Sequence, residues 1–229
     1  GTEIFFESDN QRCRNIPKTM NRILLIVALE EEFRNLPRNF PGKIAYSGVG
    51  KINASHTTTY LINEFKPDLV LMGTSARGAE RLKALGLTVL ALEPRSHADV
   101  LRAIHIIGKA LDVPIRETDL VWTNIQNALD TTAQTIPLEA KGKRVYFEVS
   151  SVPYGASESS FIGETLQRLG VQNILPGSLG PFPKINPEFV VRAQPDIIMV
   201  GDSNFADMVS RPGWKNMSAL RMERVCQFK

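Results

Sequence analysis

Three segments of the chain carry residue types that could hold a ligand. Ser151 and Tyr154 lie in a hydroxyl-rich stretch, Phe182 stands between two prolines, and Asp202 opens a third segment. Aromatic faces stabilise apolar ligands by stacking, and hydroxyl or carboxylate groups add polar contacts. Both aromatic residues could equally be local packing, and loop hydroxyls such as Ser157 often satisfy the backbone of a turn. The residue types therefore predict a binding site, with structural packing as the alternative.

Two strands and two helices must position these segments. Residues 144–149 are rich in β-branched and aromatic side chains and predict a buried strand, and residues 196–201 predict another. Residues 161–169 show helical spacing of apolar side chains up to Gly170, and residues 187–193 predict a second helix. This alternation is half of an open α/β sheet, and such sheets bind ligands beyond the carboxyl ends of their strands.

The front of the chain shows the same alternation. Residues 22–29 form the apolar run expected of a central parallel strand, and residues 43–47 predict another strand. Glu32 ends a run of three acids that opens a predicted helix, where a carboxylate faces the positive end of the helix dipole. Residues 48–65 then predict a glycine turn that leads into a helix, whose first N–H groups could receive an anion.

The middle of the chain is predominantly helical. Residues 87–92 predict a strand, and residues 99–111 and 118–135 carry apolar side chains at the spacing of amphipathic helices. Residues 137–143 are polar and predict a linker.

The rear of the chain resembles a known family through several motifs. The strings FIGETLQRLGVQNI, GPFPKINPE and AQPDIIMVG follow one another as in the C-terminal lobe of ABC-importer substrate-binding proteins with a helical backbone. Residues 66–113 resemble the end of the N-terminal lobe of that family and the start of its inter-lobe helical segment. The resemblance implies an α/β fold with two Rossmann-like three-layer lobes, mostly parallel sheets and a helical connection.

The same resemblance implies a ligand and a partner. The family captures cobalamin, haem, siderophores and related chelates, so Tyr154 and Phe182 would stack on a flat macrocycle, and Ser151 and Asp202 would add polar contacts. The family also docks on a membrane permease through an acid seven residues before the proline of a Pro-Asp strand. Glu188 stands at that distance from Pro195, whereas Tyr60 occupies the matching position in the front half. Glu188 could alternatively be an acid in a first helical turn.

Residues 22–75 resemble a different family. The strings ILLIVALEEEF, YSGVGKINASHTTTYLI and KPDLVLMGTSARG are similar to the first third of methylthioadenosine/S-adenosylhomocysteine nucleosidases. This resemblance implies that Glu32 would help to activate a nucleophilic water and that Ser75 would line a ribose pocket. The Glu-Met-Glu segment and the Ser-Asp pair of that family are missing, and cleavage of the N-glycosidic bond also needs protonation of the leaving group. We therefore expect no enzyme; Glu32 is the single catalytic candidate, with a helix-start acid as the alternative.

Two resemblances in one chain predict a chimera with a seam near residues 65–76. We expect a disordered extension over residues 1–19, an N-terminal α/β lobe over 20–95, a helical connection over 96–140 and a C-terminal α/β lobe over 141–229. A swapped β-α-β unit keeps strand order and burial, since both parents separate parallel strands by helices. The expected function is binding of a metal chelate or cobalamin-type ligand for an ABC importer, impaired if the replacement of one lobe by the graft disturbs the site. The alternatives are a nucleosidase-like enzyme and a folded chimera without ligand.

Composition excludes several classes of partner. The 229 residues carry a net charge of +3, from 27 basic and 24 acidic residues, without a basic cluster that could grip nucleic acid. The apolar runs are too short for membrane insertion. No signal peptide is visible, so the periplasmic location comes from the resemblance alone, and the chain as it stands would be cytoplasmic.

No metal site or cofactor is expected. His56, His97 and His105 are scattered and lack the i, i+4 spacing of a metal site on a helix. Cys13 and Cys226 have no metal-type spacing; they could pair, although nothing in the sequence requires it.

Overall fold

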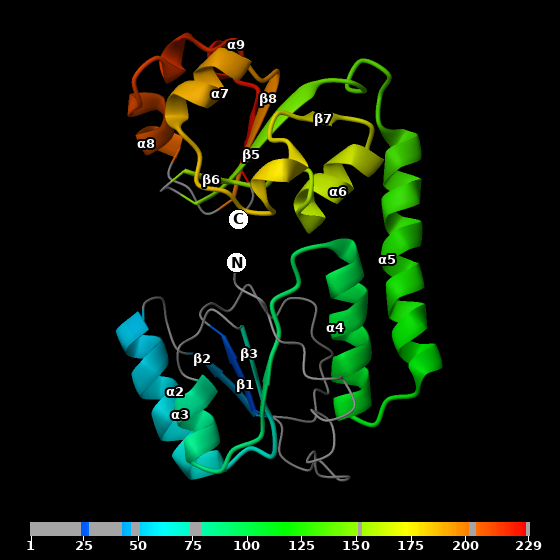
Figure 1. Cartoon of the computed structure of the whole chain (residues 1–229), viewed down its shortest axis with the longest axis vertical. Coiled ribbons are helices and arrows are strands. Elements are labelled where there is room, and N and C mark those ends of the chain that lie inside the picture. The colour runs from blue at the N-terminus through cyan, green and yellow to red at the C-terminus, as the bar shows by residue number, and fades with distance from the viewer. Residues whose placement is uncertain are drawn as a thin grey trace. The chain divides into compact units, whose positions relative to one another are not determined.

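Two compact units divide the chain. The first comprises residues 1–93 and 106–114, and the second comprises residues 94–105 and 115–229. The computed structural model describes the following parts of them (Figure 1): residues 24–27, 43–46, 51–73, 79–150, 153–201 and 205–227.

The first unit is built from parallel strand pairs and helices. Strands β1 (Leu24–Val27) and β2 (Lys43–Tyr46) pair in parallel, as do β3 (Val70–Met72) and β4 (Val89–Ala91). Helix α2 (Lys51–Phe65) buries Leu61 and Ile62, and α3 (Ala79–Ala84) precedes β4. These elements confirm the strands predicted within residues 22–29, 43–47 and 87–92 and the helix ending at Phe65. The helix predicted to open at Glu30 lies outside the described residues.

Both helices of the middle begin earlier than the sequence predicts. Helix α4 spans His97–Ala110 and α5 spans Ile115–Thr135. In α4 the Ser96 hydroxyl accepts a hydrogen bond from the N–H of Asp99, and the Asp99 carboxylate accepts one from the N–H of Ser96, a reciprocal cap that starts the helix before Asp99. In α5 the first residue directly follows Pro114, and Thr118 is buried three residues later.

The second unit contains a mostly parallel sheet. The strand order is β6-β5-β8-β9, with β7 also paired to β5. Strand β5 runs parallel to β7 and β8, β8 runs parallel to β9, and only β6 is antiparallel. The strands are β5 (Arg144–Ser150), β6 (Tyr154–Gly155), β7 (Gln172–Asn173), β8 (Ile197–Val200) and β9 (Val225–Gln227). The helices are α6 (Phe161–Arg168), η2 (Gly177–Leu179), α7 (Pro187–Ala193), α8 (Phe205–Ser210), η3 (Trp214–Asn216) and α9 (Ser218–Arg221).

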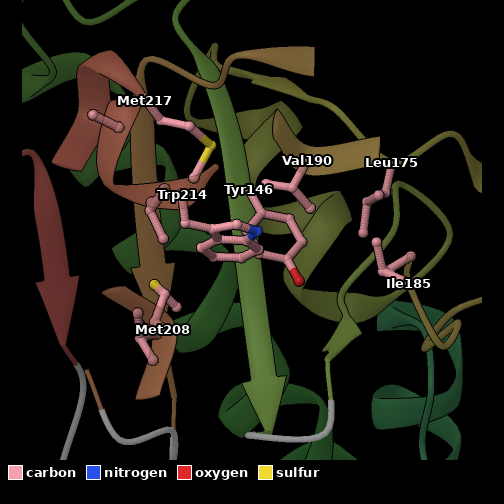
Figure 2. Close-up of a cluster of buried hydrophobic side chains, with 10 residues drawn as sticks. Tyr146, Leu175, Ile185, Val190, Met208, Trp214 and Met217 are labelled. Carbon is pink, nitrogen blue, oxygen red and sulfur yellow. The ribbon is translucent and has the colours of Figure 1, made fainter. Parts of the chain in front are cut away.

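The core of this unit is centred on β5 and β8. Val145 and Tyr146, adjacent on β5, are both fully buried, so both faces of this central strand are covered, as in parallel sheets. Figure 2 shows the Tyr146 ring beside Trp214, and the two rings meet edge to face at 6.0 Å. Met208, Met217 and Leu175 belong to the same cluster of buried side chains. The parallel-rich α/β sheet confirms the predicted fold class.

Within the described residues, no helix combines the length and the apolar character that spanning a bilayer requires.

Candidate functional site

The residues predicted to form sites fall into two groups. Tyr154, Phe182 and Glu188 lie within the described residues. Four others lie outside them: Glu32, Ser75, Ser151 and Asp202.

The segments around Tyr154 and Phe182 lie side by side, although the sequence separates them. Three backbone hydrogen bonds join them: from the N–H of Gly155 to the carbonyl of Pro183 (3.0 Å), from Ser157 to Pro181 (3.0 Å) and from Ile185 to Pro153 (2.7 Å). Tyr154 and Lys184 form an antiparallel bridge between these bonds. We call residues 153–157 and 181–185 the loop ribbon. It follows directly on the carboxyl end of β5, the edge where parallel sheets bind ligands.

The register of the loop ribbon decides which side chains share a face. The bonds on either side make Tyr154 and Lys184 a non-hydrogen-bonded pair, in which side chains approach most closely. Phe182 is two residues from Lys184 and therefore projects from the same face. Pro181 and Pro183 occupy positions where only their carbonyls are used, so the missing N–H groups cost nothing. Tyr154 is 39% exposed, Lys184 is exposed and Phe182 is half-buried.

The opposite face of the loop ribbon sits on the core. A Cβ at Gly155 would come within 2.3 Å of the Leu175 side chain and 3.2 Å of the Tyr146 ring. Ile185 is buried on the same side. Glycine at this position lets the backbone lie close to the core and leaves the aromatic face outward, whereas a side chain would have to displace Leu175.

The hydroxyl of Ser157 has a structural role. Ser157 is fully buried, and its Oγ donates to the carbonyl of Gly180 at 2.6 Å. The side-chain amide of Asn173 donates to the neighbouring carbonyl of Ala156 at 2.8 Å. These contacts hold one end of the loop ribbon in place. The hydroxyl of Ser157 therefore satisfies the backbone of a turn, which was the alternative to a role in ligand binding.

Phe182 is positioned by helix α6. Its ring meets Phe161 edge to face at 5.9 Å. Phe161 is the first residue of α6, where the Oγ of the N-cap residue Ser160 accepts from the N–H of Gly163 at 2.9 Å. The N–H of Phe161 donates outside the helix, to the carbonyl of Arg95 at 2.7 Å.

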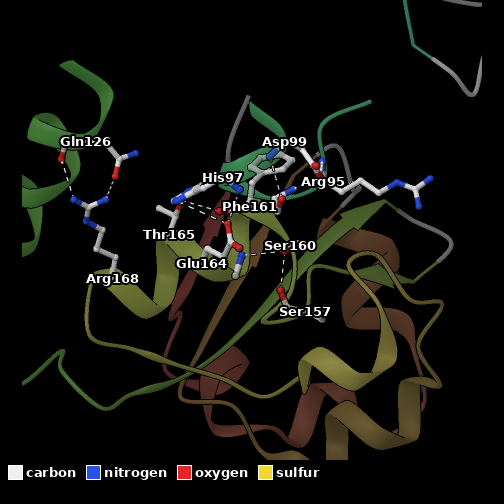
Figure 3. A network of polar contacts seen from close by, with 12 residues as sticks. Arg95, His97, Asp99, Gln126, Ser157, Ser160, Phe161, Glu164, Thr165 and Arg168 are labelled. Atoms are coloured by element: carbon white, nitrogen blue, oxygen red, sulfur yellow. Dashed lines mark hydrogen bonds and ion pairs between the residues drawn. The ribbon is translucent and has the colours of Figure 1, made fainter. Parts of the chain in front are cut away.

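Figure 3 shows how residues 95–99 are held on α6. The N–H of His97 donates to the Glu164 carboxylate at 2.5 Å, and the His97 ring contacts the Thr165 hydroxyl at 3.0 Å. The Asp99 carboxylate accepts from the N–H groups of Arg95 and Ser96, each at 3.1 Å. The start of α4 and the start of α6 are therefore joined by one polar cluster, to which the N–H of Phe161 also belongs.

Asp99 makes the stability of this cluster depend on pH. Burial of the carboxyl opposes its ionisation, but the hydrogen bonds from Arg95 and Ser96 and the charge of Arg102 outweigh burial and hold the pKa of Asp99 below its ordinary value of 3.8. Because the folded pKa is lowered, the stabilisation is present above the unfolded pKa and is lost as pH falls through the folded one. We expect Asp99→Ala to lower the free energy of unfolding by about 1 kcal/mol at neutral pH. Urea unfolding should show a difference from wild type that narrows below about pH 4. A difference that stays constant with pH would contradict this account.

The structure also contains an ion pair that sequence reasoning missed. Glu148, inside β5, is fully buried, and its two carboxylate oxygens accept from the Arg211 guanidinium at 2.7 and 2.8 Å. The Tyr146 hydroxyl donates to the same carboxylate at 3.1 Å, and Arg211 lies 4.6 Å from the centre of the Trp214 ring. The sequence offered one signal for this ion pair, an acidic residue inside an otherwise apolar strand. Its partner is 63 residues away, which no local pattern reveals.

Burial raises the pKa of Tyr146 far above its ordinary value, and the neighbouring Glu148 charge raises it further. The phenol therefore remains protonated and keeps donating to Glu148.

Glu188 is exposed near the start of α7. Its N–H donates to the Asn186 side chain at 2.9 Å, which caps the helix, and Pro187 occupies the first turn. No described residue forms an ion pair with its carboxylate.

Among the described residues no group of His, Cys, Asp or Glu side chains could hold a metal ion. Cys226 is an exposed free thiol on β9, and Cys13 lies outside the described residues.

Comparison with known proteins finds a family whose model matches most of the chain. A family model described as periplasmic binding protein matches residues 53–229. Three solved structures share the fold at low identity. A possible iron-binding periplasmic protein of Staphylococcus epidermidis has a TM-score of 0.67 and 18% identity, over 92% of this chain and 90% of that one. A periplasmic haem-binding protein solved with two haems has a TM-score of 0.60 and 21% identity, over 90% and 88%. The periplasmic vitamin B12-binding protein of Vibrio cholerae has a TM-score of 0.57 and 16% identity, over 92% and 88%.

Curated relatives point to a second group. A methylthioadenosine/S-adenosylhomocysteine nucleosidase of Lysinibacillus sphaericus is 41% identical over 69 residues, which is 30% of this chain and 30% of that protein. The nucleosidase of Staphylococcus carnosus is 30% identical over 142 residues, 59% of this chain and 55% of that protein. The matched segments thus cover 30% and 55% of the length of these two relatives.

Proposed function

The chain belongs to the periplasmic binding protein family, and we propose that it captures a flat metal chelate of the haem or cobalamin type for an ABC importer. The observation that carries this proposal is the outward aromatic face of the loop ribbon. Tyr154 and Phe182 lie on one face at the carboxyl edge of a parallel sheet, while the other face is fixed to the core.

The aromatic face suits such a ligand for a physical reason. A chelate with a flat ring system loses unfavourable contact with water when it stacks on aromatic side chains. The edge-to-face contact with Phe161 pre-orients Phe182, so little rotamer freedom is lost on binding. Solved proteins of the same fold that bind haem and vitamin B12 support the choice of ligand class.

Other residues of the predicted site complete the proposal. Ser151 and Asp202 follow β5 and β8 in sequence and would add polar contacts from the same edge of the sheet. Glu188 would dock on the permease, which its exposed position favours, as does the lack of an ion pair between its carboxylate and any residue that the structure describes. The protein would act outside the cytoplasm, as the family name indicates, and would release its ligand unchanged rather than catalyse a reaction.

The proposal is tested by titration with three probes: ferric haem, cyanocobalamin and a ferric siderophore. We expect saturable binding of at least one, with one site per chain. Tyr154→Ala should weaken that binding about tenfold, since an aromatic stacking contact contributes about 1–3 kcal/mol. Tyr60→Ala is the matched control, because Tyr60 is an exposed tyrosine on α2 and should leave the affinity unchanged. Failure to bind any probe would favour a folded chimera without ligand.

The nucleosidase alternative rests on the matched segments of those enzymes. Incubation with methylthioadenosine should release no adenine under the binding-protein proposal. Release of adenine that Glu32→Gln abolishes would contradict it, because Glu32 is the chain's candidate for activating the nucleophilic water.

A further inference from the structure

We propose that Lys184 makes the loop ribbon selective for an anionic chelate, a flat metal complex that carries a carboxylate at its rim. This inference rests on the proposed function and adds the charge of the ligand to it.

The register of the loop ribbon puts a cation beside the aromatic face. Tyr154 and Lys184 are directly opposite in a non-hydrogen-bonded pair, where Cβ atoms lie about 4.5–5.5 Å apart. Phe182 is diagonal to Tyr154 on the same face, within reach of an aromatic side chain. A ring stacked on these two side chains therefore has its rim within the length of the lysine stem.

The backbone under Lys184 is held firmly. Pro183 and Ile185, its two neighbours, make hydrogen bonds to Gly155 and Pro153, and Ile185 is buried. Only the four-carbon stem of Lys184 remains adjustable, and from this backbone position its ammonium group can reach the rim of a ring stacked on Tyr154.

The charge of Lys184 is also uncompensated within the described residues. Two arginines of this unit are matched by nearby carboxylates, Arg168 by Asp130 at 2.6 Å and Arg144 by Asp196 at 3.6 Å. No described carboxylate forms an ion pair with Lys184. An ammonium group beside an apolar face, without an internal counter-ion, favours a ligand that brings its own negative charge.

Lysine stems also pack on tyrosine rings without any role for the charge. In that case the charge of the ligand would not affect its affinity, and the two explanations differ in a measurable way.

The test compares ferric protoporphyrin IX with its dimethyl ester, which has the same ring and metal but no free carboxylates. Both are titrated by absorbance against the full chain, the Lys184→Gln variant and the Lys184→Arg variant. We expect wild type to bind the free acid about fivefold more tightly than the ester, because a partly exposed ion pair stabilises a complex only modestly. Lys184→Gln should remove this preference and leave the ester affinity unchanged, and Lys184→Arg should restore it.

Salt provides a second readout. The preference for the free acid should shrink as ionic strength rises, because screening weakens a partly exposed ion pair. Equal affinity of wild type for acid and ester would overturn the inference about Lys184 and leave the proposed function standing. Equal weakening of both compounds by Lys184→Gln would also overturn it. Binding of neither compound by wild type would overturn the inference, and with it a haem-type ligand.

Discussion

Replacement of either partner of the Glu148–Arg211 pair is expected to lower the free energy of unfolding by about 3–5 kcal/mol, because it breaks a buried ion pair held by two charge-assisted hydrogen bonds. Glu148 is fully buried, and the Arg211 side chain is only 12% exposed. In Glu148→Gln the guanidinium loses both charge-assisted hydrogen bonds. In Arg211→Met the carboxylate keeps only the Tyr146 hydroxyl.

The double variant separates pairing from burial. Glu148→Gln combined with Arg211→Met should cost less than the sum of the single variants, by roughly 1–3 kcal/mol, since no charge is then stranded. Urea unfolding of the four proteins gives this coupling directly. Arg144→Met is the control: its pair with Asp196 is long and half-exposed, so we expect a loss of about 0–1 kcal/mol. Single variants as stable as wild type would contradict the assignment of a buried ion pair.

Gly163→Ala is expected to be the second most disruptive change. A Cβ at this position would lie 1.9 Å from the Ser157 carbonyl oxygen and 2.7 Å from the Glu158 Cα. Both atoms belong to the backbone and cannot rotate away, so α6 or the end of the loop ribbon must shift. We expect a net loss of about 1–3 kcal/mol or more from this overpacking, although alanine favours a helix interior over glycine by about 1 kcal/mol.

The same variant should also weaken ligand binding, because Ser157 ends the first strand of the loop ribbon. Thermal unfolding and titration with ferric haem measure the two effects. Gly177→Ala is the matched control: its nearest neighbour would be the Ser159 Cβ at 3.4 Å, an ordinary contact, so a change within about 0.5 kcal/mol is expected. Wild-type stability for Gly163→Ala would show that α6 does not pack against the ribbon as described.

Local sequence patterns predicted the elements well where periodicity and caps were clear. The strand over residues 144–149, the helix over 187–193 and the stop at Gly170 are all present. Elements that depend on distant partners were missed. Strand β6 forms because it pairs with β5, and β9 forms because it pairs with β8.

Trp214 is another residue whose environment could not be predicted from local sequence patterns. It stands in a sequence without apolar periodicity, yet it is fully buried between Tyr146 and Arg211. Its contacts are determined by tertiary packing, which neither propensity nor spacing encodes. The alternation Pro-Phe-Pro-Lys, in contrast, already places Phe182 and Lys184 on one face. Only the partner strand, which brings Tyr154 opposite Lys184, needed the structure.

The front of the chain shows why resemblance and fold can diverge. Its motifs resemble a nucleosidase, and the curated matches agree over part of the length. Solved binding proteins nevertheless match the fold over about nine-tenths of the chain. Parallel β-α-β units bury the same faces in both groups, so sheet formation places little constraint on which loops follow the strands. The chimera with a seam near residues 65–76 stays our hypothesis for this combination.

The most direct test of the account is amide hydrogen exchange of the full chain with and without ferric haem. The account predicts that saturating haem slows exchange in peptides covering residues 153–157 and 181–185, and that Tyr154→Ala reduces this protection. Haem that binds while these two segments exchange at unchanged rates would contradict the loop ribbon as the ligand site.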